Sequence, residues 1–112
     1  MKVALIRPPE VNPYWKAKRP SLGISYIASY LKTHSIEAKL FDANYNAWSE
    51  QQTVELVSRY RPDIIGISSM THDIGSSHTI AGLLKEAVDN VQTFIGGCHI
   101  TALPQESLIE FT

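Results

Sequence analysis

The sequence predicts an α/β fold in which a parallel sheet carries helices on both faces, and two observations lead to it. Short apolar runs alternate along the chain with longer segments whose apolar residues fall three and four positions apart. The first run, Val3–Ile6, is continuous, as in a strand that is buried on both faces. Alternating strands and helices of this kind form parallel sheets through right-handed crossovers.

Four segments are predicted to be strands because each is a short apolar run that closes on a turn or breaker signal. The first run is followed by Arg7-Pro8-Pro9, the second by Asp42 and the last by Gly96-Gly97. The predicted strands are Val3–Ile6, Ala38–Phe41, Ile64–Ser68 and Val91–Ile95.

The predicted helices have identifiable starts. Ser21 is a favourable N-cap residue, and Ser49 with Gln52 three positions later forms a capping-box pattern. Pro104 suits the first turn of a last helix. The inner stripes are expected to be Ile24, Ile27, Ala28 and Leu31 after Ser21; Val54, Val57 and Tyr60 after Ser49; Ile80, Leu83, Leu84, Ala87 and Val88 in a helix over Ser77–Asn90; and Leu108 and Ile109 after Pro104.

The resulting order, βαβαβαβα, fits a doubly wound, flavodoxin-like (Rossmann-like) sheet with strand order 2-1-3-4, truncated before a fifth strand. We therefore expect residues 1–112 to be one domain and a fragment of a longer chain. The outer edge of the fourth strand would then be unpaired, which predicts self-association through that edge.

Composition and charge exclude several classes of function. Among 112 residues, ten are Lys or Arg and eleven are Asp or Glu, so neither a nucleic acid nor an anionic membrane is an expected partner. Cys98 is the only cysteine, which excludes an internal disulfide. The first apolar run is too short for a signal peptide, and no run is long enough for a membrane span. We expect a cytoplasmic location.

A ligand of such a sheet binds at the carboxyl ends of the strands, where the strand order reverses. Three loops rich in Gly, Ser, Thr, His or Pro converge there, at residues 7–20, 68–76 and 96–103. Gly96-Gly97 allows a ligand to approach the backbone closely, although a tight turn would use the same residues. The hydroxyls that follow the third strand could bond the polar edge of a ligand or cap a helix.

The same loops exclude the phosphate-dominated ligands of this architecture. Arg7-Pro8-Pro9-Glu10 has neither a Gly-x-Gly-x-x-Gly nor a P-loop pattern, and its two prolines remove two N–H donors from a phosphate cradle. A bulky ligand with little phosphate remains. His72 and Cys98 lack partners with metal-ligand or nucleophile spacing, whereas His99 follows the last strand and is a candidate ligand contact.

Four segments carry a family resemblance, and together they span nearly the whole chain in order. The Ser68-x-Met70 and Gly96-Gly97 sequences resemble the Ser-x-Leu and Gly-Gly signatures of cobalamin-binding domains. More narrowly, the chain is similar to the N-terminal domain of cobalamin-dependent radical S-adenosylmethionine enzymes, of the magnesium-protoporphyrin IX monomethyl ester oxidative cyclase-like group. The matching segments are Leu5-Ile6-Arg7-Pro8-Pro9, Pro20-Ser21-Leu22-Gly23-Ile24, residues 62–68 and residues 96–104.

The resemblance implies a cobalamin-binding module that performs no chemistry alone. In that family the nucleotide tail of the cofactor threads between the loops after the third and fourth strands, and the corrin ring lies over the carboxyl edge of the sheet. No catalytic or metal-ligating residue is implied in this segment. The implied cofactor-binding residues are Pro8, Pro9, Leu22, Gly23, Ser68, Met70, Thr71, Gly96, Gly97, His99 and Thr101.

Two departures from related domains refine what the resemblance implies. The loop after the first strand lacks the cobalt-coordinating His of the methionine synthase type, which implies base-off cobalamin with no protein His on cobalt. The three-cysteine motif of the radical domain is also absent. S-adenosylmethionine and a 4Fe-4S cluster are therefore implied for a catalytic domain beyond Thr112, in a methyltransferase or an oxidative cyclase.

A second hypothesis comes from a different class of function. A flavodoxin-like domain of the same kind could have lost cobalamin and serve as an interaction or substrate-positioning module. The small residues Ser68, Gly96 and Gly97 at the carboxyl edge favour cobalamin binding over this alternative.

Overall fold

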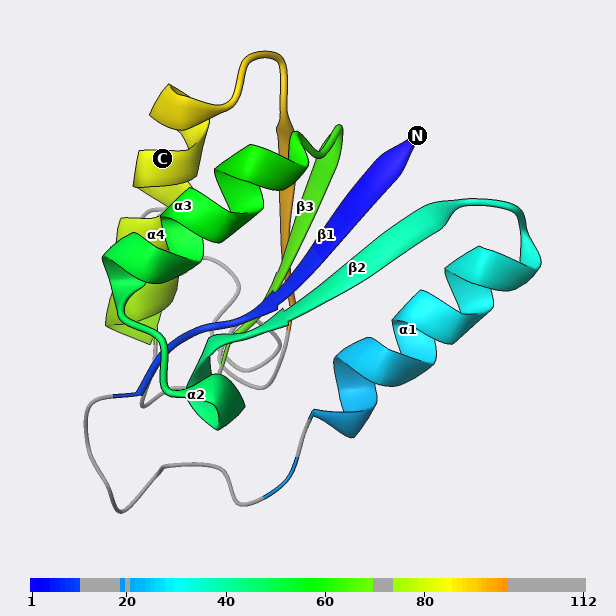
Figure 1. Ribbon diagram of the computed structural model, residues 1–112, viewed down its shortest axis with the longest axis horizontal. Coiled ribbons are helices and arrows are strands. Elements are labelled where there is room, and N and C mark those ends of the chain that lie inside the picture. Colours follow the sequence, from blue (N-terminus) through cyan, green and yellow to red (C-terminus); the bar gives the residue numbers. More distant parts are fainter. Residues whose placement is uncertain (11–18, 20, 70–73, 97–112) are drawn as a thin grey trace.

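Within residues 1–10, 19, 21–69 and 74–96, the part of the chain that the computed structural model describes, four parallel strands form a sheet with helices on both faces (Figure 1). No helix in these residues combines the length and the apolarity that a membrane span requires. The elements are β1 (Lys2–Arg7), α1 (Leu22–Thr33), β2 (Glu37–Asp42), α2 (Ala43–Asn46), α3 (Glu50–Tyr60), β3 (Ile64–Ser68), α4 (Ile74–Ala87) and β4 (Gln92–Gly96).

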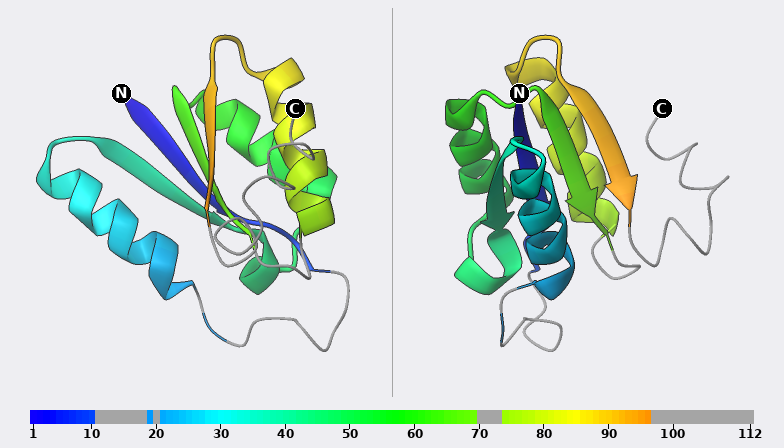
Figure 2. Two further views of the ribbon diagram at one scale, coloured as in Figure 1. Left: turned by 180° about the vertical axis from the view of Figure 1, so that it is seen from behind. Right: turned by 90° about the vertical axis from the view of Figure 1, so that its right-hand side faces the viewer.

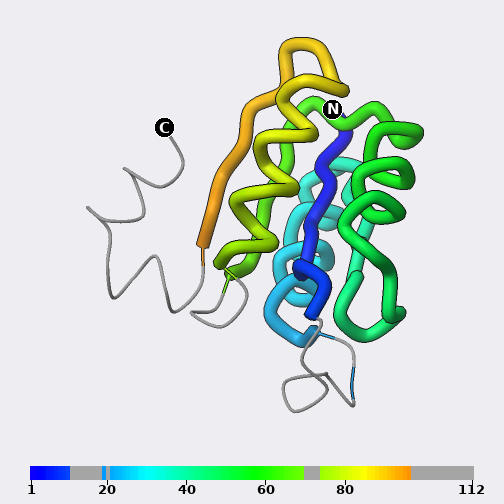
Figure 3. Tube along the Cα trace, turned by 90° about the vertical axis from the view of Figure 1, so that its left-hand side faces the viewer, coloured from blue at the N-terminus to red at the C-terminus, as the bar shows by residue number. Residues whose placement is uncertain are grey.

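The strand order is β2-β1-β3-β4 and each neighbouring pair is parallel, which confirms the predicted 2-1-3-4 sheet. Val3 of β1 is in register with Ala38 on one side and with Ile64 on the other. β1 is therefore an inner strand. Its Val3–Ile6 segment is buried throughout because α1 packs against one face of the sheet and α3 and α4 against the other (Figures 2 and 3).

Alternate residues of β1 belong to two separate apolar cores, as the pleat of a strand requires. Ala4 and Ile6 join the larger core under α3 and α4, whereas Val3 and Leu5 join the smaller core under α1. On the second face α1 lies over β2 and β1, and no other described element covers β3 and β4 there (Figure 2, right). The two faces of the sheet are thus covered unequally.

The signals at the helix starts operate largely as predicted. In α3, Ser49 Oγ accepts a hydrogen bond from Gln52 N at 3.1 Å, and Ser49 N donates to Gln52 Oε1 at 2.8 Å, which completes the capping box. Ser21 lies at the N-cap of α1, as predicted, but its side chain makes no capping bond. The predicted helix after Pro104 lies outside the described residues.

The prediction for α4 is wrong in its bounds and in part of its inner stripe. The helix spans Ile74–Ala87 instead of Ser77–Asn90, and Leu83 and Ala87 are exposed. The prediction placed every large apolar residue of the helix on its inner face. In the structure two small residues, Ser77 and Ala81, occupy inner positions and let the helix lie close to its neighbours. The buried face of the helix consists of Ser77, Ile80, Ala81 and Leu84, and Val88, just after the helix, is also buried.

We expect two adjacent leucines of α4 to contribute very differently to stability. Leu84→Ala removes a fully buried side chain and should lower the free energy of unfolding by about 2–5 kcal/mol, as large-to-small core substitutions do. Leu83→Ala should cost less than about 1 kcal/mol because its side chain is partly solvated. Urea denaturation of both variants measures the difference. Equal losses would contradict this assignment of the inner face.

Candidate functional site

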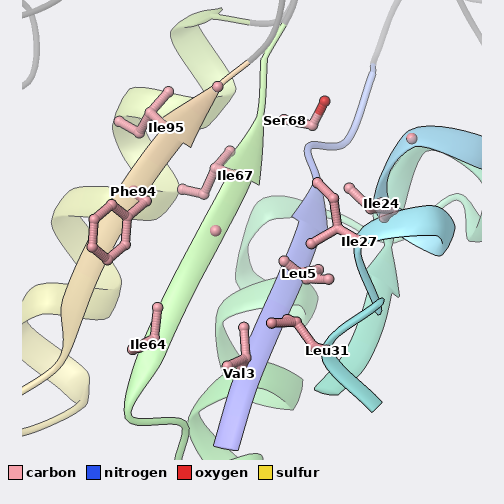
Figure 4. Close-up of a pocket in the computed structure, with 13 residues that line it drawn as sticks. Val3, Leu5, Ile24, Ile27, Leu31, Ile64, Ile67, Ser68, Phe94 and Ile95 are labelled. Carbon is pink, nitrogen blue, oxygen red and sulfur yellow. The ribbon is translucent and has the colours of Figure 1, made fainter. Parts of the chain in front are cut away.

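An open apolar groove of about 450 Å³ runs along the face of the sheet that α1 covers only in part (Figure 4). Strands β1, β3 and β4 form its floor, and α1 forms one wall. It reaches the carboxyl ends of β3 and β4, the edge at which the sequence predicts a ligand. Its lining residues are Val3, Leu5, Gly23, Ile24, Ile27, Leu31, Ile64, Gly66, Ile67, Ser68, Phe94, Ile95 and Gly96.

The depth of the groove depends on Gly66, in the middle of β3. Gly66 alternates with Ile65 and Ile67, which are buried in the larger core, so it belongs to the groove face. A Cβ at this position would lie 3.0 Å from Leu5 Cδ2, inside normal contact distance. The absence of a side chain therefore lets Leu5 of β1 pack over this part of β3, and Gly66 itself lines the floor of the groove. Gly66 was not predicted as a site residue, although a glycine inside a strand is itself a sign of close approach.

The two sides of the groove carry exposed apolar side chains. Ile27 of α1 was predicted to be part of the inner stripe, but it is 50% exposed and faces the groove. Ile24 and Ala28 of the same predicted stripe are buried. Phe94 of β4 is 59% exposed on the other side (Figure 4). Contiguous apolar side chains left open in this way are typical of a surface that takes a ligand or a partner.

Ser68 and Gly96 lie side by side at the carboxyl end of the groove, because the two residues are in register between β3 and β4. Ser69 N donates a hydrogen bond of 2.7 Å to Gly96 O, which holds the two strand ends together. Among the residues that the structure describes, none has an atom within 4 Å of a Cβ built on Gly96. Local packing therefore does not require a glycine here, and the space beside it is open to a ligand.

The predicted site residues fall into three groups. Gly23, Ser68 and Gly96 line the groove. Leu22 is exposed at the start of α1, and Pro8 and Pro9 are buried at the end of β1, so these three lie outside the lining. The remaining predictions lie outside the described residues: Met70, Thr71, Gly97, His99 and Thr101.

An ion pair at the carboxyl edge fixes the wall of the groove. Arg7, the last residue of β1, donates from Nε to Asp42 Oδ1 at 2.6 Å and from Nη2 to Asp42 Oδ2 at 2.7 Å. Asp42, the last residue of β2, also accepts bonds from Ser21 N at 2.9 Å and Tyr45 N at 3.1 Å. One carboxylate thus joins the ends of two strands to the starts of α1 and α2.

Arg7 and Asp42 also bind residues near the end of the segment that connects β1 to α1. Arg7 Nη2 donates to Arg19 O at 2.9 Å, so the residue from which that segment starts is bonded to a residue near its end. A planar guanidinium suits this role because its fork matches a carboxylate and leaves further N–H donors free. Asp42 was predicted only as the end of a strand, and α2 was not predicted.

We expect this pair to contribute far more to stability than the other ion pair of the described residues, between Arg59 and Glu55. Asp42→Ala should lower the free energy of unfolding by about 3 kcal/mol, because it leaves a partly buried guanidinium and two backbone N–H groups without their acceptor. Glu55→Ala removes a solvent-exposed i,i+4 partner and should cost less than about 0.5 kcal/mol. Thermal and urea unfolding of the two variants test this, and similar costs would refute the structural role of Asp42.

The sequence is similar to those of two methyltransferases and a cyclase. The chain is 26% identical over 113 residues to an uncharacterized methyltransferase of Pyrococcus horikoshii, covering 98% of this chain and 24% of the relative. It is 32% identical over 92 residues to the anaerobic magnesium-protoporphyrin IX monomethyl ester cyclase of Rubrivivax gelatinosus, covering 81% and 17%. It is 28% identical to the cytidylyl-2-hydroxyethylphosphonate methyltransferase of Streptomyces wedmorensis, covering 78% and 20%. The chain therefore spans less than a quarter of these relatives.

A solved structure shares the fold. The radical S-adenosylmethionine methyltransferase TsrM from Kitasatospora setae, determined with cobalamin and a [4Fe-4S] cluster bound, matches with a TM-score of 0.76 and 15% identity. The match covers 98% of this chain and 22% of TsrM. Residues 16–111 match the B12 binding domain family. That match spans most of the sequence, so the chain belongs to the B12-binding domain family.

Proposed function

We propose that residues 1–112 form the cobalamin-binding module of a radical S-adenosylmethionine enzyme and that the groove beside α1 holds part of the cofactor. One observation carries the placement. The groove is lined by two glycines, Gly66 in its floor and Gly96 at its mouth by the carboxyl edge, and neither adds a side chain that would narrow it. A chain of the B12-binding family needs such a passage for the nucleotide tail of cobalamin.

The residues of the groove fit this group chemically. The tail of cobalamin ends in a flat, largely apolar base, and the groove offers aliphatic and aromatic walls, with Ile27 and Phe94 exposed on opposite sides. Ser68 places a hydroxyl at the mouth, where a polar edge of the ligand would need a donor or an acceptor. Apolar cover along the groove would exclude water from the bound base.

The other predicted residues complete the proposal at the carboxyl edge. Met70, Thr71, Gly97, His99 and Thr101 belong to the loops after β3 and β4, and Leu22 and Gly23 to the start of α1. Pro8 and Pro9 are buried, so their part is to fix the path of the chain below the ligand. The segment 7–20 contains no His, and we propose that no protein imidazole coordinates cobalt.

The chemistry of the parent enzyme is proposed from its relatives. Bound cobalamin supplies a cobalt ion that can carry and transfer a methyl group. S-adenosylmethionine and the 4Fe-4S cluster would belong to a catalytic domain beyond residue 112, in a methyltransferase or an oxidative cyclase. Self-association through the outer edge of β4 remains part of the proposal. The alternative, an interaction domain without cobalamin, is less well supported because the groove and its glycines are present.

Gly96→Val should separate ligand binding from folding. A valine at the mouth of the groove should weaken the affinity for hydroxocobalamin by about tenfold or more, because its side chain fills space that the ligand needs. The free energy of unfolding should change by less than about 0.5 kcal/mol, since the new Cβ meets no atom of the described part of the chain and valine suits a strand. Absorbance titration of this chain, and of a longer one that carries the catalytic domain, measures binding.

Gln92→Val is the matched control for this substitution. Gln92 lies on the same strand and the same face as Gly96 but outside the groove, so cobalamin affinity should stay unchanged. Unaltered binding by Gly96→Val, or no binding by the longer chain, would overturn the proposed site.

A further inference from the structure

Helix α1 carries large apolar side chains on its outer surface as well as on the side that faces the sheet. Leu22, Tyr26 and Tyr30 recur every four residues and are 72%, 73% and 65% exposed. The helix has no charged residue before Lys32, near its end. Its polar residues before Lys32 are only Ser25 and Ser29, and an exposed row of large apolar side chains on a helix is typical of a contact surface. We define Leu22, Tyr26 and Tyr30 as the outer stripe of α1.

Helix α3 shows what a solvated helix of the same chain looks like. Its exposed positions are polar or charged, including Gln51, Glu55 and Arg59, while Thr53 and Val57 are buried. This is the ordinary division of an amphipathic surface helix. The outer stripe of α1 departs from that division, because three large apolar side chains are exposed in a row along one helix.

The outer stripe lies next to the proposed cofactor site. Leu22 is the first residue of α1, at the carboxyl edge, and Tyr30 follows about 12 Å along the helix at 1.5 Å per residue. Ile27, which forms the groove wall, lies on the same helix and is also exposed, so the groove and the stripe share one element. Figure 1 shows α1 at one side of the molecule, with no described element against its outer surface.

We propose that the outer stripe of α1 is the docking surface for the catalytic domain of the same enzyme. The inference rests on the proposed function and names the surface through which that function is assembled. Relatives of the chain are more than four times as long as the segment they share with it, so a large partner is available in such chains. A domain that acts on a cofactor at the carboxyl edge must reach that edge, where the stripe begins.

The chemistry of the stripe suits a contact between domains. Two tyrosines offer large apolar rings with a hydroxyl at the tip, the composition enriched at protein interfaces. No charge has to be desolvated on the outer stripe when it is covered, because the nearest charged side chain of α1 is Lys32. The partner surface is accordingly apolar, with hydrogen-bonding groups for Tyr26 and Tyr30.

Hydroxyl-radical footprinting with mass spectrometry tests this proposal, because the oxidation rate of a side chain reports its exposure. Tyr26 and Tyr30 should be oxidised about five- to tenfold more slowly in the longer chain than in the 112-residue chain, as expected for side chains in an interface core. Leu83, partly exposed on the opposite face of the domain, should react equally in both. Both chains are measured without cobalamin.

A pair of variants separates docking from folding and from cofactor binding. Tyr26→Lys with Tyr30→Lys in the longer chain should return Leu22 to the oxidation rate that it has in the 112-residue chain. The control, Thr79→Lys with Leu83→Lys, adds the same charges at the same spacing on α4 and should leave Leu22 protected. Neither pair should change the affinity of the 112-residue chain for hydroxocobalamin.

The possible outcomes are distinct. Equal reactivity of Tyr26 and Tyr30 in the two chains would overturn the proposal. Protection that grows with concentration in the 112-residue chain would also overturn it and would identify a second copy as the occupant. Protected tyrosines in a longer chain that fails to bind cobalamin would support the docking surface and reject the cofactor assignment.

Discussion

The ion pair between Arg7 and Asp42 is the contact on which the geometry of the carboxyl edge of the sheet depends. It joins the last residues of β1 and β2, and the same carboxylate holds the first backbone N–H groups of α1 and α2. The pair therefore fixes the ends of β1 and β2 in relation to α1, the helix that forms the wall of the groove. A bidentate, mostly buried pair with additional backbone donors achieves this, whereas a single exposed ion pair would not.

The unequal cover of the two sheet faces turns this fixed edge into a site. On one face, α3 and α4 close a continuous core over the inner strands. On the other face, α1 buries Val3 and Leu5 and leaves β3 and β4 open. Gly66 lies in the floor of this open region and adds no side chain to it. Binding capacity in this domain arises from what the fold leaves uncovered next to a rigid carboxyl edge.

Sequence reasoning succeeded where local chemistry decides the structure. Continuous apolar runs marked the buried strands, and Ser49 with Gln52 marked the start of α3, because strand burial and helix capping depend on neighbouring residues. The strand order followed from crossover rules that hold for any chain of this pattern. Ser68 and Gly96 were placed together at the carboxyl edge because they end adjacent strands.

Features that depend on three-dimensional neighbours were missed or misplaced. The several partners of Asp42 come from segments far apart in the sequence, so no local pattern reveals them. Ile27 and Leu83 are of residue types that usually lie in cores, and only the position of the sheet shows that their side chains are exposed. Gly66 was predicted only as part of a strand. Its close approach to Leu5 involves the neighbouring strand, so the local sequence does not show it.

The central claim is that cobalamin occupies the groove beside α1 rather than the opposite face of the sheet. A ¹⁵N–¹H correlation spectrum of this 12.5 kDa chain, recorded during titration with hydroxocobalamin, tests it directly. The account predicts that the backbone amides of Gly66, Ser68 and Gly96 shift together, while those of Leu84 and Val57 in the opposite core stay in place. Shifts confined to the α3 and α4 side, with the three groove residues unchanged at saturation, would contradict it.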